Sequence, residues 1–458
     1  MKIVLANLFA LLFMCTCLSV LYVWTTLESR LDRHKRSTFP GPAVEHPRSL
    51  RSGGPSTDPS PKTFRALLAV PAAERLQRPA GVYNLNTSTG SPDHRMSYHG
   101  DNEGGSARRA RGGEDRADRF DPNPVEDGIF WSQRLEEQLS AGFTEEHARA
   151  WRARARAQRV VRLEPGCGRI SNQLATFSDG TRACVRYGIN ADQVQGETLT
   201  SCLATLLGIA NLPPLVLSQL SGTGAGAAGG GEQWASVRRR VEGLQWSERA
   251  VVSLTEWVAN LTGVVTPSLL RQEGGDAGGG GGGLHPFRQE LRNKTRAELF
   301  ELMQWSDLIL MDYLTANFDR LVSNLFSLQW DPRVMERDTN NLLRAPRGDL
   351  LFIDNEAGLV HGYRVLGMWE KYHDTVLGSV CVFRRRTARR VAEMSARQDA
   401  RARLLELYRD TEPLAPVLGF LSDEHAGLLQ ARIDAVHRHI SHCREKYGRP
   451  LTYPSQRY

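Results

Sequence analysis

The first 120 residues contain too few apolar side chains to build a folded core, apart from one run at the N-terminus. Residues 37–119 are rich in Pro, Ser, Gly, Arg and Asp and show neither helical nor strand periodicity. Such a segment cannot bury enough apolar surface to offset the conformational entropy lost on folding. Two internal tracts, Gly222–Gly231 and Gly274–Gly283, are dominated by glycine and predict flexible insertions at about 221–232 and 273–284. We therefore predict a disordered stem over 30–119 and one folded unit over 120–458.

The N-terminal exception is the run Ile3–Trp24, which contains no charged residue. A helix of this length rises about 1.5 Å per residue and covers the roughly 30 Å hydrocarbon core of a bilayer. The run is longer than the apolar part of a cleaved signal peptide and lacks a clear cleavage site. We therefore predict a signal anchor within residues 1–29. Two basic clusters in the stem, Arg33–Arg36 and Arg108–Arg111, are either processing sites that release a soluble form or ordinary stem residues.

Two signals disagree about the side of the membrane on which the folded unit lies. The positive-inside rule, applied to the basic residues within Arg30–Arg36, places it in the cytosol. Three N-glycosylation sequons, at Asn86, Asn260 and Asn293, indicate the lumen, although each triplet is weak evidence by itself.

The net charge of +7 does not indicate nucleic-acid binding, because Arg is scattered and no nucleic-acid module accompanies it. A basic lumenal protein suits acidic substrates or glycans. Cys15 and Cys17 lie inside the apolar run, which leaves five of the seven cysteines. No Cys-x-x-Cys or Cys/His spacing supports zinc, so disulfides are expected. Since five is odd, at least one thiol stays free or pairs between chains.

The folded unit combines strand and helical patterns, and its last part is mostly helical, so we predict an α+β fold. The expected helices are Glu145–Gln158, Glu197–Leu207 and Arg296–Leu314, with mostly helical sequence over Thr387–Tyr447. The expected strands are Leu174–Phe177, Arg182–Tyr187, Val251–Leu254 and Leu350–Ile353. The short segment Val160–Leu163 precedes the first of these strands, and Asn317–Asn324 is expected to be a polar loop.

Two acidic residues far apart in the chain are the candidates for chemistry. Asp319 and Asn324 have the spacing D-x-x-x-x-N of the protein-kinase catalytic loop, and Asp354 directly follows the apolar strand. Phosphoryl transfer requires a carboxylate beside the attacking hydroxyl and oxygen ligands for the metal that bridges the phosphates. The spacing alone is weak, since Asp commonly begins a turn. The order of helix, loop, strand and Asp matches the second half of a kinase.

The segments Asn317–Arg320 and Asp354–Gly358 resemble the Four-jointed family of Golgi kinases, within the wider group of atypical secretory-pathway kinases. The resemblance extends from about Phe120 to the C-terminus, apart from the two glycine tracts. It implies a two-lobed protein-kinase-like fold, with a small strand-rich N-lobe and a larger helical C-lobe, in a type II Golgi membrane protein whose body is lumenal. It also implies a disulfide between Cys381 and Cys443.

The resemblance assigns a role to each candidate residue. Asp319 is the catalytic base, Asp354 the principal metal ligand and Asn324 a second metal ligand. Glu197 lies on the helix facing the nucleotide and supports Arg186 on the adjacent strand.

The sequence departs from an ordinary kinase at Arg186, where the usual residue is Lys. Arg keeps the charge and can fork onto phosphate oxygens, but the two side chains are not interchangeable. Asp-Asn-Glu replaces the usual Asp-Phe-Gly, so Glu356 either adds a carboxylate near the metal or faces solvent. Gly166 and Gly168 either begin a loop over the phosphates or form a turn without a ligand.

The resemblance implies transfer of the ATP γ-phosphate, with Mn²⁺ or Mg²⁺, to Ser or Thr of extracellular cadherin-type domains of the Fat/Dachsous type, and hence a role in planar cell polarity and growth. Two alternatives are a glycan kinase and a secreted ligand or pseudokinase that binds without catalysis. Arg186 and the basic clusters slightly favour the pseudokinase. The joint presence of Asp319, Asn324 and Asp354 argues against it.

Overall fold

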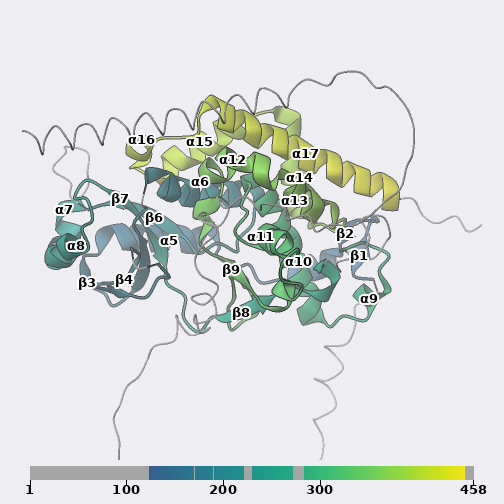
Figure 1. The fold of residues 1–458 in the computed structure, drawn as a ribbon, viewed down its shortest axis with the longest axis horizontal. Coiled ribbons are helices and arrows are strands. Elements are labelled where there is room, and N and C mark those ends of the chain that lie inside the picture. The colour runs from purple at the N-terminus through teal and green to yellow at the C-terminus, as the bar shows by residue number, and fades with distance from the viewer. Residues whose placement is uncertain (1–122, 170, 189, 221–229, 272–282, 449–458) are drawn as a thin grey trace, which may run out of the picture. The chain divides into compact units, whose positions relative to one another are not determined.

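The computed structural model describes residues 123–448, except residues 170, 189, 221–229 and 272–282 (Figure 1). The predicted anchor, the predicted stem with its basic clusters and the sequon at Asn86 lie outside the described residues. Within the described part of the chain, no helix has both the length and the apolar character needed to cross a membrane.

A five-stranded antiparallel sheet, in the order β3-β4-β5-β7-β6, forms the first half of this region (Figure 1). Its strands are β3 (Val160–Pro165), β4 (Gln173–Phe177), β5 (Arg182–Arg186), β6 (Leu215–Gln219) and β7 (Val251–Glu256). The turn between β4 and β5 contains Gly180, which supplies a φ of +83°. With α5 (Glu145–Ala157), α7 (Gly230–Gln233) and α8 (Arg238–Gly243), the sheet encloses a small core that includes Trp151, Phe177 and Trp234.

The second half is mostly helical and contains a three-stranded antiparallel sheet, β10-β9-β8. Its strands and helices are β8 (Thr262–Val265), β9 (Asp338–Arg344), β10 (Leu350–Phe352), α10 (Arg296–Thr315), α11 (Leu321–Ser327), α12 (Val360–Arg364), α13 (Leu366–Gly378), α14 (Arg385–Arg397), α15 (Ala400–Thr411), α16 (Ala415–Leu418) and α17 (Asp423–Tyr447). Shorter elements are β1 (Val125–Glu126), β2 (Phe130–Trp131), α4 (Gln133–Gln138), α9 (Gln289–Arg292) and the 3₁₀ turn η4 (Asn355–Ala357).

Helix α6 (Ala191–Leu207) belongs to both halves. It contacts β6 and β7 of the large sheet, while Leu199 and Leu203 belong to the larger core that the C-terminal helices share. Gly196 allows the helix to approach η4 closely, because a Cβ atom there would lie 2.7 Å from the carbonyl oxygen of Gly358. This approach brings the following residue, Glu197, to the segment that carries Asp354 and Glu356.

The predicted strands and helices are present, and most of their bounds agree to within two residues, but two predicted bounds differ by more. Helix α6 begins at Ala191 rather than Glu197, because the side chain of Asn190 caps it by accepting a hydrogen bond from the backbone of Gln193. The prediction of a polar loop over Asn317–Asn324 is wrong in its second half, since α11 starts at Leu321.

The described structure resumes at residues 230 and 283, inside the bounds predicted for the insertions at 221–232 and 273–284. Residues 230–233 form α7, which Gln233 anchors by donating a 2.6 Å hydrogen bond to the carbonyl of Ala155. Leu284 is fully buried and donates its N–H to the carbonyl of Ser379 at 2.7 Å.

Four of the five cysteines among the described residues form two disulfides, Cys167–Cys184 and Cys381–Cys443, so the implied pair Cys381–Cys443 is confirmed. Cys202, in α6, is the free thiol. Burial raises the pKa of Cys202 to about 12, with a further contribution from Glu412. A buried, protonated thiol is unsuited to pairing between chains.

Candidate active site

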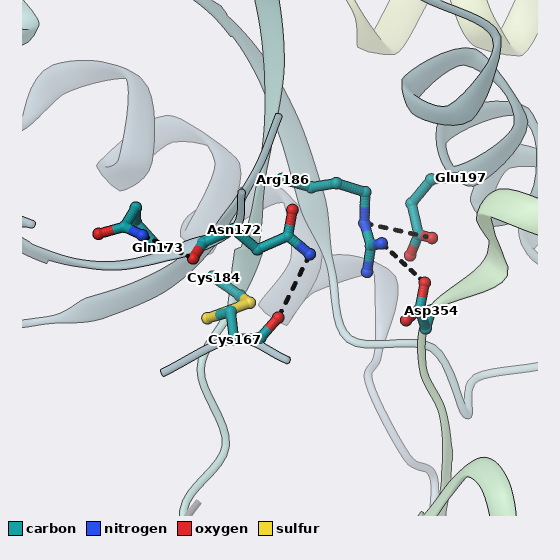
Figure 2. The surroundings of a disulfide bond; sticks show 7 residues. All are labelled: Cys167, Asn172, Gln173, Cys184, Arg186, Glu197 and Asp354. Carbon is teal, nitrogen blue, oxygen red and sulfur yellow. Dashed lines mark hydrogen bonds and ion pairs between the residues drawn. A yellow bond between two sulfur atoms is a disulfide. The ribbon is translucent and has the colours of Figure 1, made fainter. Parts of the chain in front are cut away.

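Arg186, the last residue of β5, extends into a group of three carboxylates. Its Nη1 lies 2.7 Å from Oδ1 of Asp354 and 2.8 Å from Oε2 of Glu356, and its Nε lies 3.8 Å from Oε2 of Glu197. Figure 2 shows the guanidinium group directed at Glu197 and Asp354. Arg186, Glu197 and Glu356 are buried, so water screens these charges only weakly. The ion pairs join the large sheet to the segment that follows β10.

Burial and the neighbouring charges shift the pKa values of these groups. Burial raises the pKa of Glu197 to about 6, against the opposing effect of Arg186. Burial, followed by the charge of Asp354, also raises the pKa of Glu356. For Arg186, burial alone would lower the pKa, but the three carboxylates together outweigh it and raise the pKa. The guanidinium group therefore stays charged, and the excess of acidic groups suits a divalent cation.

Asp354 has a left-handed backbone conformation, with φ +55° and ψ +57°. Asp and Asn adopt this conformation more readily than other residues with a side chain, and such backbone positions are concentrated at functional sites. The adjacent residues are held in place by Arg320, whose Nη2 donates to the carbonyl of Ile353 at 2.9 Å and to Oδ1 of Asn355. The side chain of Asp354 is 28% exposed, so a ligand can reach its carboxylate.

Arg320 directly follows Asp319 and fixes the loop of Asp319 to the segment of Asp354. It is only 1% exposed. Besides its bonds beside Asp354, it pairs through Nη1 with Asp312 of α10, and its Nε donates to the carbonyl of Asn341 at 3.2 Å. Burial raises the pKa of Asp312 to about 6, although the charge of Arg320 opposes this shift.

Asp319 lies in the short loop between α10 and α11. Its backbone N–H donates to Oδ1 of Asn317 at 3.1 Å, and its Oδ2 accepts a 2.9 Å hydrogen bond from Nδ2 of Asn341. The carbonyl of Asn341 in turn accepts the N–H of Ile353 at 3.2 Å. One residue of β9 therefore connects the two candidate carboxylates, Asp319 and Asp354.

Asn324 is buried in α11, and its Nδ2 has no hydrogen-bond partner among the residues that the structure describes. An unpaired buried amide costs about 1–3 kcal/mol, which a bound group would recover by supplying the partner. Asp319, Asn324 and Asp354 together offer oxygen ligands, which Mg²⁺ and Mn²⁺ prefer. The residues present therefore fit a nucleotide with its divalent metal.

The loop between β3 and β4 carries Gly166 and Gly168, and two contacts hold it beside the site. The disulfide from Cys167 joins it to Cys184, two residues before Arg186 on β5 (Figure 2). Arg169 forms an ion pair with Oε1 of Glu356. The loop therefore lies next to the carboxylate group, while a role for its glycines in binding phosphates stays a prediction.

Two further predicted modification sites lie on the surface. The side chains of Asn260 and Asn293 are exposed, and their glycosylation stays a prediction. Cys381, His439 and Cys443 are grouped closely enough to suggest a metal site, but their two sulfur atoms are bonded to each other.

Comparison with known proteins identifies the family. The family profile described as "Four-jointed box protein middle domain" matches residues 146–446. The chain belongs to the Four-jointed family. This finding confirms the resemblance drawn from Asn317–Arg320 and Asp354–Gly358.

Several relatives of this family are similar over most of the chain. "Four-jointed box protein 1" of Xiphophorus maculatus is 62% identical over 98% of this chain and 100% of its own length. The Homo sapiens protein of the same name is 51% identical over 92% and 90%. The Drosophila melanogaster "Extracellular serine/threonine protein kinase four-jointed" is 34% identical over 70% of this chain and 61% of its own length.

Among solved structures, the Golgi casein kinase with Mn/ADP bound has a TM-score of 0.44 and 12% identity, over 67% of this chain and 78% of that chain. A likeness this distant carries no argument about the site, which depends on the contacts described above.

Proposed function

We propose that this chain is a Golgi serine/threonine protein kinase with a two-lobed kinase fold. It transfers the γ-phosphate of ATP to extracellular cadherin-type domains of the Fat/Dachsous type, and its N-terminal anchor keeps the catalytic region in the lumen. The observation that carries the proposal is the 2.7 Å ion pair between Arg186 of the sheet half and Asp354 of the helical half. Asp319 is tied to the same segment through Asn341.

The contacts support a separate catalytic or binding role for each residue. Asp319, oriented by Asn341, accepts the proton of the attacking hydroxyl. Asp354 and Asn324 would hold the divalent metal, which would neutralise phosphate charge. Arg186 orients phosphate oxygens, because the planar guanidinium group can donate two parallel hydrogen bonds to them.

The proposed role of Glu356 differs from the metal ligand suggested by its sequence position. Its Oε2 pairs with Arg186 and its Oε1 with Arg169, so both carboxylate oxygens are already engaged. These contacts favour a role for Glu356, together with Glu197, in positioning Arg186. They argue against Glu356 as a metal ligand or as a side chain that faces solvent.

The acceptor rests on family membership. The Drosophila relative is named an extracellular serine/threonine protein kinase, which supports a protein acceptor in the secretory pathway. We extend this proposal to cadherin-type domains as the acceptor, and hence to a role in planar cell polarity and growth control.

The test is transfer of label from ATP by the purified full chain, with Mn²⁺ or Mg²⁺, to cadherin repeats and, separately, to a proteoglycan acceptor. We expect label on Ser or Thr of the cadherin repeats and none with Asp354→Asn. Label only on the glycan would favour a sugar kinase. Label on neither acceptor, with ATP still bound, would favour a pseudokinase.

A further inference from the structure

A continuous set of aromatic side chains begins beside Asp319 and ends in solvent. Phe318 stacks on Trp369 with ring centroids 4.9 Å apart, Trp369 meets Phe326 at 5.0 Å, and Phe326 meets Trp330 at 4.8 Å. Tyr372 packs edge-on against Phe326 at 5.4 Å. We call these five residues the aromatic ladder.

Packing of the core explains the inner part of the ladder but not its outer end. Trp369 is 4% exposed and belongs to the larger core, and Phe318, Phe326 and Tyr372 pack against that core. Trp330 lies outside the core and is 67% exposed. Met368 is exposed as well and lies one helical turn before Tyr372 on α13, which extends the apolar surface. An exposed Trp at the edge of an apolar surface is typical of a protein-binding site.

We propose that the aromatic ladder is the docking surface for a polypeptide acceptor, a proposal that rests on the proposed kinase function. Its inner end, Phe318, is partly exposed and is the residue before the candidate base, so the ladder begins next to the proposed site of transfer. The three ring-to-ring steps place Trp330 at most about 15 Å from Phe318, which an extended chain covers in about five residues. An apolar side chain about five residues from the target Ser or Thr therefore contacts Trp330.

The ring geometry favours a polypeptide over a sugar. A sugar stacks on an open aromatic face, but Phe318 and Trp369 stack on each other with only 4° between their planes. Lys371 places its Nζ 4.7 Å from the ring centre of Tyr372, which covers that face. The exposed Trp330 suits an apolar side chain of a peptide chain.

The test measures transfer by the full chain to cadherin repeats at varied acceptor concentration. Trp330→Ala is expected to raise the KM for the acceptor about tenfold, with the change in KM rather than in kcat. Trp330→Phe, which keeps an aromatic ring, should restore most of the loss. The matched control is Phe287→Ala: Phe287 is another exposed aromatic residue (56%), contacts Tyr447 outside the ladder, and its removal should change neither constant.

The outcomes separate this proposal from the proposed function. If the unaltered chain phosphorylates the repeats and Trp330→Ala has the same KM, the docking surface is wrong and the kinase stands. If Trp330→Ala weakens only a glycan acceptor, the polypeptide occupant is wrong. If the unaltered chain modifies no polypeptide, the kinase proposal itself fails. A thermal melt of each variant checks that folding is unchanged.

Discussion

The side-chain amide of Asn341 donates a 2.9 Å hydrogen bond to Oδ2 of Asp319. Asn341 belongs to β9, has a φ of +57°, and its carbonyl accepts hydrogen bonds from Ile353 and Arg320. The orientation of the candidate base is therefore set by the strand beside the Asp354 segment.

Replacing Asn341 with Gly should lower kcat about ten- to hundredfold, because a hydrogen bond to a carboxylate contributes about 1.5–3 kcal/mol. Gly accepts the positive φ, so the change removes the side chain without backbone strain. The KM for ATP should change little. Gln245→Gly is the control, since Gln245 also has a φ of +57° but lies after α8. Equal kcat values for the two variants would contradict the orienting role.

Removing the guanidinium group of Arg186 from the carboxylates around it should destabilise the fold. Arg186→Met leaves Glu197, Asp354 and Glu356 without their shared partner, and breaking such a buried arrangement costs about 3–5 kcal/mol. Arg186→Lys keeps the charge and should cost less. Urea unfolding measures both, with Arg182→Met on the same strand as control, since its half-exposed pair with Glu164 contributes under about 1 kcal/mol. A loss for Arg186→Met no larger than that of the control would refute a shared structural role.

Asp354→Asn should abolish metal-dependent nucleotide binding while keeping the fold. Asn tolerates the left-handed backbone that Asp354 adopts, and it preserves the shape of the side chain. In the unaltered chain, ATP with Mn²⁺ should raise the melting temperature, and chelation of the metal should reverse this. The variant should show neither effect. A full thermal shift in Asp354→Asn would contradict the assignment of Asp354 as a metal ligand.

Glu412 should make stability depend on pH. Burial raises its pKa from 4.5 to about 7, although Arg156 and the N–H of Leu217 oppose the shift. Between these values the folded chain holds a proton that the unfolded chain has released, so the free energy of unfolding falls as pH rises. The full contribution is present below pH 4.5, and about 3 kcal/mol is lost by pH 7. Chemical unfolding of Glu412→Gln should lack this slope. An identical slope in both proteins would assign the dependence elsewhere.

Local patterns in the sequence account for much of the fold but not for the network around the site. Strands β3, β4 and β5 and helix α10 follow from apolar periodicity and turn residues. Strand β9 escaped prediction because its sequence, Asp-Thr-Asn-Asn-Leu-Leu-Arg, is polar at its start. Its stability depends on pairing with β8 and β10, which no local pattern reports.

The candidate residues show the same division. Asp319, Asn324 and Asp354 were found through their spacing and the strand between them. Arg320 and Asn341 were missed because their partners lie 8 to 35 residues away and only the folded chain brings them together. A buried Arg beside a candidate base has no sequence signal of its own.

The bond between Cys167 and Cys184 ties the loop beside Arg186 to β5. Without that bond, the other described link from this loop to the carboxylate group is the ion pair between Arg169 and Glu356. Completion of the proposed nucleotide site is therefore expected to depend on thiol oxidation, and a copy of the chain kept in a reducing compartment should lack this link between the loop and β5.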